Sequence, residues 1–259
     1  MAKVYLVGAG PGAPDLLTLR AARVIENADV VFYDALVHPD TVALAVYAKK
    51  VAVGKRAGQV STDQRFINRQ LVEAGRHYQT VVRLKGGDPM MFGRAQEEID
   101  ALKAAGIDVE VVPGITAALA ASASLGVSLT RRGVARTVSF VTPRVGPNET
   151  ESDWLTAAAA ADSTILYMAA GRAPQIAAAL IGAGKSSSTP VAIVENASLE
   201  NERRIFTTLA GLTASLLNLA GPAVLCVGQV FAVEAEADAG AGSHESRMRE
   251  MHAPRCLAG

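Results

Sequence analysis

Five short segments of this chain combine turn-forming residues with side chains that can bind ions or move protons. They are Gly8-Ala9-Gly10-Pro11-Gly12, Asp34, Gly54-Lys55-Arg56, Lys85-Gly86-Gly87-Asp88-Pro89 and Pro113-Gly114-Ile115-Thr116. Glycine lets the backbone approach a flat or bulky ligand, and a positioned carboxylate can accept a proton. The segments therefore predict a small-molecule site.

Each of these segments follows a predicted β-strand. The strands are short runs rich in β-branched residues, and helical patterns separate them, as is typical of a parallel α/β sheet. Ligands of such sheets bind beyond the carboxyl ends of the strands, so we expect the five segments to line one cleft. The predicted strands are Lys3–Val7, Asp29–Tyr33, Lys50–Val53, Thr80–Leu84 and Val109–Val112.

The helices between these strands are predicted from apolar spacing and end signals. Leu17, Ala21, Val24 and Ala28 recur three and four residues apart and give a first helix one apolar face. Ser61 and Gln64 fit a capping box that opens a second helix carrying Phe66, Ile67, Leu71 and Ala74. A third helix, with Ile99 and Leu102, is predicted to end at Gly106.

The second half of the chain repeats the alternation less regularly. Proline and glycine at 113–117 predict a junction between an N-terminal α/β domain, 1–112, and a C-terminal α/β domain, 118–233. The tail 234–259 lacks periodicity and is expected to be disordered. Helices are predicted at Pro174–Ile181 and Leu212–Leu219, and strands at Thr137–Thr142, Thr164–Tyr167, Val191–Glu195, Arg203–Thr208 and Val224–Val227.

The first glycine-rich segment also fits a dinucleotide-binding pattern. Gly8, Gly10 and Ala13 match G-x-G-x-x-A, and Asp34 lies near the distance at which an acidic residue binds a ribose. A diphosphate site needs a helix to open at the glycines, however, and Pro11 and Pro14 delay the helix and remove two backbone donors. A nicotinamide-dependent oxidoreductase is therefore kept as an alternative of a different class.

Taken in order, the motifs resemble the uroporphyrinogen-III C-methyltransferases. The similarity covers about residues 3–230, and its ordered set of motifs is highly specific although each motif alone is not. The matching blocks are Val7–Gly12, Tyr33–Val37, Val53–Lys55, Arg83–Pro89, Phe92–Arg94, Val112–Thr116, Ser128–Arg132, Tyr167–Met168 and Thr189–Ala192.

The resemblance implies a two-lobed class III α/β methyltransferase with the ligand cleft between the lobes, working as a homodimer. It implies S-adenosyl-L-methionine as cofactor, S-adenosyl-L-homocysteine as its product, and uroporphyrinogen III as substrate, in cobalamin or sirohaem biosynthesis. Asp34 matches the family's proposed proton acceptor and Lys55 its proposed proton donor. The residues matching cofactor contacts are Pro11, Gly86, Gly87, Asp88, Met91, Thr116, Ala117, Met168 and Ala197.

The chain departs from the family's pattern at several positions. Ala35 replaces a common arginine, Met90 and Met91 replace an aromatic-aliphatic pair, and Ala197 replaces a common glycine. The stretch 141–144, Val-Thr-Pro-Arg, replaces a common Thr-Gly-His and leaves the substrate contacts of that loop open. The methionine pair keeps the predicted pocket apolar.

Cations are expected where a multiply carboxylated macrocycle binds. Arginine binds carboxylates in a bidentate manner, and the Arg131-Arg132 pair is the best placed for this role. A carboxylate facing the ring, such as Asp34, would stabilise the positive charge that develops during methyl transfer. The predicted substrate-binding cations are Arg56, Arg131, Arg132 and Arg136, with Lys55 beside them.

Composition excludes several other classes. The 259 residues carry 25 basic and 25 acidic side chains, which is not the charge of a general nucleic-acid binder. No apolar run reaches membrane-spanning length, and no room is left for a secretory peptide before the first strand, so we expect a cytoplasmic protein. Neither the four histidines nor Cys226 and Cys256 have metal-ligand spacing.

Two further alternatives remain within reach of the same motifs. One is another precorrin methyltransferase of cobalamin synthesis, although the Tyr33–Val37 and Arg83–Pro89 blocks favour uroporphyrinogen III as the substrate. The other is a catalytically silent tetrapyrrole-binding protein, because a pocket can persist without its chemistry.

Overall fold

The computed structural model describes residues 2–54, 63–146, 153–215 and 219–232, which form two compact α/β units. The first unit contains the residues up to Ala121 together with Asn196–Glu202. The second contains Ser122–Glu195 and the described residues from Arg203 onward. The predicted junction at 113–117 runs into the first residue of helix α5 (Ala117–Leu125), and the two units divide within that helix, between Ala121 and Ser122.

The first unit is built on a five-stranded sheet in the order β3-β2-β4-β1-β5. Every pairing in it is parallel, as the alternation of strands and helices predicts. All five carboxyl ends therefore meet at one edge of the sheet. The strands are β1 (Lys3–Gly8), β2 (Val30–Tyr33), β3 (Lys49–Ala52), β4 (Thr80–Lys85) and β5 (Asp108–Val112).

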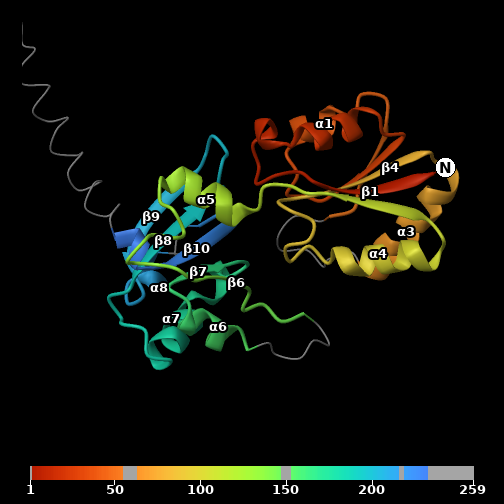
Figure 1. Cartoon of the computed structure of the whole chain (residues 1–259). Coiled ribbons are helices and arrows are strands. Elements are labelled where there is room, and N and C mark those ends of the chain that lie inside the picture. The colour runs from red at the N-terminus through yellow and green to blue at the C-terminus, as the bar shows by residue number, and fades with distance from the viewer. Residues whose placement is uncertain (1, 55–62, 147–152, 216–218, 233–259) are drawn as a thin grey trace, which may run out of the picture. The chain divides into compact units, whose positions relative to one another are not determined.

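Helices cover both faces of this sheet (Figure 1). On one face α1 (Leu19–Glu26) packs Ala21 and Ile25 against Val31 and Val82. On the other face lie α3 (Gln64–His77) and α4 (Ala95–Ala104), whose apolar side chains surround Val4 and Leu6. Two short helices, η1 (Pro14–Leu16) and α2 (Pro39–Ala43), follow β1 and β2.

Local end signals explain where these helices begin and stop. The Thr18 hydroxyl accepts a hydrogen bond from the Ala21 amide and starts α1 after the proline-rich turn. Gly106, with φ +71°, follows the end of α4 and confirms the predicted stop. The predicted capping box is wrong, because the carboxylate of Asp63 is the N-cap of α3, whereas Ser61 lies outside the described residues.

The second unit has a mixed five-stranded sheet in the order β6-β7-β10-β8-β9. β6 and β7 are parallel, while β10 is antiparallel to both of its neighbours and β8 is antiparallel to β9. The strands are β6 (Val138–Val141), β7 (Ser163–Leu166), β8 (Pro190–Glu195), β9 (Arg203–Thr208) and β10 (Ala223–Gly228), so each strand predicted for this half is confirmed within two residues.

One apolar core fills the second unit. It includes Leu166, Ile193 and Leu225 from the sheet and Ile176 and Leu180 from a helix. Cys226 is fully buried, and burial raises the pKa of its thiol to about 12, so it is an unreactive core residue. The helices of this unit are α6 (Trp154–Ala160), η2 (Ala170–Arg172), α7 (Ala173–Gly182), α8 (Leu212–Ser215) and η3 (Gln229–Phe231).

Candidate functional site

The loops after β1, β4 and β5 meet at the carboxyl edge of the first sheet. The amide of Gly10 donates to the Gly87 carbonyl at 3.2 Å, and the amide of Gly87 donates back to Gly10 at 2.6 Å. The Asp88 carboxylate accepts from the amides of Met90 at 2.8 Å and Gly114 at 2.9 Å. The predicted convergence of these three loops is therefore confirmed. Asp88 itself ties two of the loops together.

Glycine is required where these loops touch. A Cβ on Gly8 would lie 2.6 Å from Gly114 Cα, and a Cβ on Gly114 would lie 2.8 Å from Gly8 Cα. Gly87 differs, because its φ is +70° and a Cβ there would meet nothing closer than 3.9 Å. Its backbone is therefore open on that side, which is how a glycine serves close approach of a ligand.

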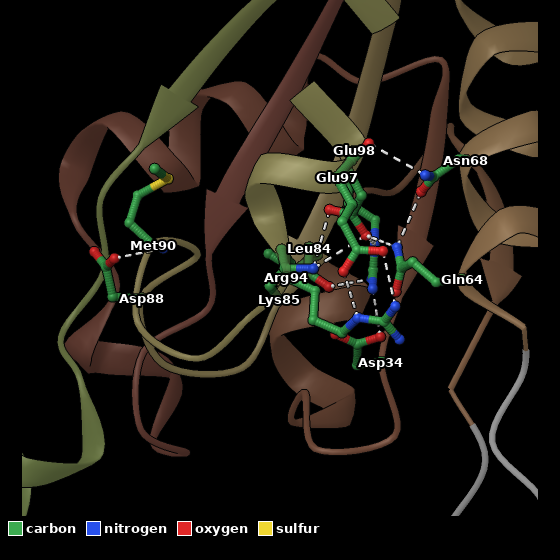
Figure 2. A network of polar contacts seen from close by, with 11 residues as sticks. Asp34, Gln64, Asn68, Leu84, Lys85, Asp88, Met90, Arg94, Glu97 and Glu98 are labelled. Carbon is green, nitrogen blue, oxygen red and sulfur yellow. Dashed lines mark hydrogen bonds and ion pairs between the residues drawn. The ribbon is translucent and has the colours of Figure 1, made fainter. Parts of the chain in front are cut away.

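Asp34 follows β2 and is the exposed member of a buried charged cluster (Figure 2). Arg83 on β4 donates from Nη2 to Asp34 Oδ1 at 2.6 Å and from Nε to Glu98 Oε1 at 3.1 Å. Lys85 donates to both Glu98 oxygens at 3.0 Å. The Asp34 side chain is 30% exposed, while Arg83, Lys85 and Glu98 are buried. Helix capping does not explain Asp34, because His38 is the N-cap of α2.

Burial and ion pairing act in opposite directions on the two cations of this cluster. Burial lowers the pKa of Lys85, neighbouring Arg83 lowers it further, and Glu98 only partly offsets them, so its pKa lies below the ordinary 10.5. For Arg83, burial is outweighed by Asp34 and Glu98, and the pKa is raised above its ordinary range. Arg83 is therefore a permanent cation beside Asp34.

A distant segment completes the edge of the first unit. Residues Asn196–Glu202 leave β8, join the first unit and return to β9. The Ser198 hydroxyl accepts from the Ala13 amide at 3.0 Å, and a Cβ on Gly12 would lie 2.9 Å from Leu199. Ala197 is thereby placed beside the first glycine-rich loop, although the sequence assigns it to the other domain.

The predicted cofactor contacts are distributed over both units. Met168 lies in the second unit, after β7, with φ +52° and a half-exposed side chain. The others lie in the first unit, on or near the three joined loops and the Asn196–Glu202 segment: Pro11, Gly86, Gly87, Asp88, Met91, Thr116, Ala117 and Ala197.

The predicted substrate cations that the structure describes lie in the second unit, whereas Asp34 lies in the first. Arg131, Arg132 and Arg136 belong to the second unit and are exposed, in and just after a tight turn closed by a bridge between Arg131 and Ala135. Lys55 and Arg56 lie outside the described residues. The roles assigned to these residues remain predictions.

Sequence reasoning missed the buried charged cluster of Arg83, Lys85 and Glu98, although it placed Lys85 in one of the predicted ligand loops. A signal for the first two exists, because both charges stand in the strand Thr80–Lys85, whose neighbours are apolar and buried. Glu98 gives no such signal, since it occurs in the charged run Gln96–Asp100, which reads as a solvated helix face.

The segments that follow β2 and β4 carry exposed apolar side chains. Leu36 is 66% exposed, Met90 55% and Phe92 38%. The Leu36 Cβ lies 3.3 Å from where a Cβ on Gly86 would be, so it lies beside the glycine pair. The exposed Leu36 side chain, two residues after Asp34, therefore offers an apolar contact beside the glycine pair.

Neither a membrane-spanning helix nor a metal-binding cluster occurs among the described residues. None of the helices described is long and apolar enough to cross a membrane. Within the same residues, no group of three or more histidine, cysteine, aspartate or glutamate side chains is arranged to hold a metal ion.

Comparisons with known proteins agree on one family. Residues 3–213 match the tetrapyrrole (corrin/porphyrin) methylases. A uroporphyrinogen-III C-methyltransferase of Pseudomonas aeruginosa is 44% identical over 88% of this chain and 94% of its own length. A siroheme synthase of Chromobacterium violaceum is 44% identical, but the chain spans only 49% of that protein.

Solved structures give the same result. A uroporphyrin-III C-methyl transferase of Thermus thermophilus, complexed with S-adenosyl homocysteine, superposes with a TM-score of 0.79 at 40% identity, covering 90% of this chain and 100% of that one. A cobalt precorrin-4 methyltransferase superposes with a TM-score of 0.78 at 30% identity, covering 88% and 95% of the two chains.

Proposed function

The chain belongs to the tetrapyrrole methylases, and on that premise we propose that it transfers methyl groups from S-adenosyl-L-methionine to carbon atoms of uroporphyrinogen III. The observation that carries this proposal is the partly exposed Asp34 carboxylate, held by the buried Arg83 in the same unit as the open backbone of Gly87. The proposed setting is cobalamin or sirohaem biosynthesis in the cytoplasm, with the chain acting as a homodimer.

The first unit has features that fit the cofactor. The backbone of Gly87 is open to a ligand, and Thr116 and Ala197 are buried next to it or next to the first loop. When bound, the cofactor supplies an electrophilic methyl group on a sulfonium. The chain's own contribution is to orient both reactants and to exclude water, because the methyl group and the attacking carbon must lie in line at near-contact distance.

Asp34 has the chemistry that the substrate requires. As the new carbon–carbon bond forms and the carbon–sulfur bond breaks, the pyrrole gains positive charge and must then lose a proton. A carboxylate facing the ring stabilises that charge and accepts the proton. The exposed Leu36, Met90 and Phe92 offer apolar contact to the macrocycle. Lys55 as proton donor and Arg56, Arg131, Arg132 and Arg136 as carboxylate ligands complete the proposal.

The test is anaerobic incubation with S-adenosyl-L-methionine and freshly reduced uroporphyrinogen III, followed by mass spectrometry of the tetrapyrrole. We expect mass gains in steps of one methyl group, with S-adenosylhomocysteine released in equal amount. A protein that binds the cofactor but leaves the tetrapyrrole unchanged would contradict the substrate assignment.

A later precorrin is the second candidate substrate. The likeness to a cobalt precorrin-4 methyltransferase at 30% identity favours testing it, although the uroporphyrinogen-III enzyme of Pseudomonas aeruginosa is more similar. Methyl transfer to a precorrin, with none to uroporphyrinogen III, would select this candidate.

A further inference from the structure

The Asp34 carboxylate is fixed by a chain of contacts that begins in the core. Figure 2 shows Glu98 of α4 at the centre of this chain, with Lys85 and Gln64 directed at its carboxylate. Glu98 is fully buried, and its Oε1 accepts from Arg83 Nε at 3.1 Å, from Lys85 Nζ at 3.0 Å and from Gln64 Nε2 at 3.1 Å. A buried carboxylate with so many donors has one well-defined orientation.

Arg83 transmits that orientation to Asp34. Its Nε donates to Glu98, its Nη1 to the Leu84 carbonyl at 3.1 Å, and its Nη2 to Asp34 Oδ1 at 2.6 Å. Because the guanidinium is planar and rigid, anchoring Nε and Nη1 also fixes the direction of the Nη2 hydrogen bond. The position of Asp34 Oδ1 therefore depends on a carboxylate that it does not touch.

The charges of the cluster make Glu98 necessary for this geometry. Arg83 and Lys85 are two buried cations, and Glu98 is the carboxylate that both of them contact. If Glu98 loses its charge, Asp34 is left as the anion of the cluster, and Arg83 is free to turn toward it or toward solvent. Glu98 on α4 thus determines the orientation of the Asp34 side chain after β2.

We propose that Glu98 is a positioning residue, which orients the Asp34 carboxylate for methyl transfer by holding Arg83. The inference rests on the proposed function, because the rate of methyl transfer is the quantity that reports the orientation of Asp34. Glu98 is fully buried, so it acts on Asp34 through Arg83. A displacement of about 1 Å in a reacting group can reduce a rate roughly a hundredfold, so the effect is large enough to measure.

The test compares Glu98→Gln, Asp34→Asn and the double variant in single-turnover methyl transfer with saturating S-adenosyl-L-methionine and uroporphyrinogen III. We expect Glu98→Gln to lower the rate about tenfold to a hundredfold. S-adenosylhomocysteine affinity, measured by calorimetry, should stay within about twofold of the wild-type value. In the Asp34→Asn background the same substitution should change the rate less than about twofold, because residues that act through one another are not additive.

The matched control is Asp29→Asn. Asp29 precedes β2 and accepts from the amides of Gln79 at 3.0 Å and Thr80 at 2.8 Å, so it stabilises the opposite ends of the two strands that carry Asp34 and Arg83. We expect this variant to be less stable than the wild type but to transfer methyl groups at the wild-type rate. It separates a loss of orientation from a general weakening of the sheet.

Arg83→Lys provides a second variant if Glu98→Gln does not fold, because it keeps the charge but lacks the rigid planar fork whose separate nitrogens contact the two carboxylates. It should show the same loss of rate and the same non-additivity with Asp34→Asn. Full rate in either variant, or a loss that is undiminished in the Asp34→Asn background, would overturn the positioning role. Absence of methyl transfer by the wild-type enzyme would instead overturn the proposed function.

Discussion

At the scale of single residues, the candidate site depends on how Asp34 is surrounded. One of its oxygens is bound to Arg83, and the side chain remains partly exposed beside Leu36 and the glycine pair. A carboxylate that is anchored at one oxygen and accessible at the rest of its surface can meet a reacting ring. The same residue fully buried would serve only the fold.

We expect Asp34→Asn to lower the rate of methyl transfer by about a hundredfold or more, because the amide can neither accept the proton nor stabilise the cation. The variant should bind S-adenosylhomocysteine as the wild type does, since the glycine loops do not use the Asp34 side chain in the described contacts. Single-turnover kinetics and calorimetry check the two halves of this prediction. An unchanged rate would remove Asp34 from the mechanism.

At the scale of elements, the β8–β9 hairpin of the second unit supports a segment of the first. Glu195 ends β8 and is buried, and its Oε2 pairs with Arg203 Nη1 at 3.0 Å across the hairpin. Its Oε1 accepts from the amides of Ala220 and Gly221 at 2.6 Å. This carboxylate therefore fixes both ends of the Asn196–Glu202 segment.

Glu195→Gln should lower the free energy of unfolding of the second unit by about 1–3 kcal/mol, because one of the two acceptor oxygens becomes an NH2 group that faces donors and the charge opposite Arg203 is lost. The single tryptophan, Trp154, packs against the core of that unit, so its fluorescence during urea unfolding measures the change. Glu73→Gln, which removes an exposed helix-surface pair, is the control and should have almost no effect.

The same carboxylate predicts a pH dependence. Burial alone would raise the pKa of Glu195, but the amides of Gly221 and Ala220 and the charge of Arg203 outweigh it, and the pKa lies below its ordinary 4.5. A lowered folded-state pKa contributes stability that is present above pH 4.5 and is lost as pH falls through the folded-state value. Wild-type protein should therefore lose more stability than Glu195→Gln on acidification below this pH. Parallel pH profiles would contradict this.

The elements that the sequence predicts well are those with a local signal. The strand Thr80–Lys85 stands out by its β-branched residues, and α4 by its apolar spacing and Gly106. Helix α2 is five residues long, too short for a periodic pattern. The direction of β10 is not readable either, because a buried strand has the same composition whether its neighbours are parallel or antiparallel.

The site divides in the same way. Convergence of the glycine loops follows from strand order alone, because loops at one edge of a parallel sheet must meet. The Glu98–Arg83–Asp34 contacts and the approach of Ser198 to Ala13 depend on tertiary packing. No local sequence pattern predicts that Glu98 faces the core, or that the segment Asn196–Glu202 joins the first unit.

At the scale of the whole molecule, the same fold occurs alone and as part of longer chains. The chain covers 94% of the Pseudomonas aeruginosa methyltransferase but 49% of the Chromobacterium violaceum siroheme synthase. Each unit has its own core and its own sheet.

Cofactor binding should be visible in the stability of the whole chain. S-adenosylhomocysteine at about a hundred times its dissociation constant should stabilise the protein by about 2.7 kcal/mol through mass action. NADH at the same concentration should leave the unfolding midpoint unchanged. The backbone of Gly10 is already hydrogen-bonded to Gly87, and the first helix begins only at Pro14, so no helix N-terminus lies at the glycines to bind a diphosphate. Differential scanning fluorimetry with both ligands decides this, and stabilisation by NADH alone would restore the oxidoreductase alternative.

The segment Asn196–Glu202 also determines when, during synthesis, the first glycine-rich loop acquires its last hydrogen-bond partner. Ser198 accepts a hydrogen bond from Ala13, a residue 185 positions earlier in the chain. At about 5–20 residues per second, the ribosome needs roughly ten to forty seconds between these two residues. During that time the first glycine-rich loop has strands and helices around it but not its last neighbour. A nascent chain that ends before Ser198 therefore lacks this hydrogen-bond partner of the first glycine-rich loop.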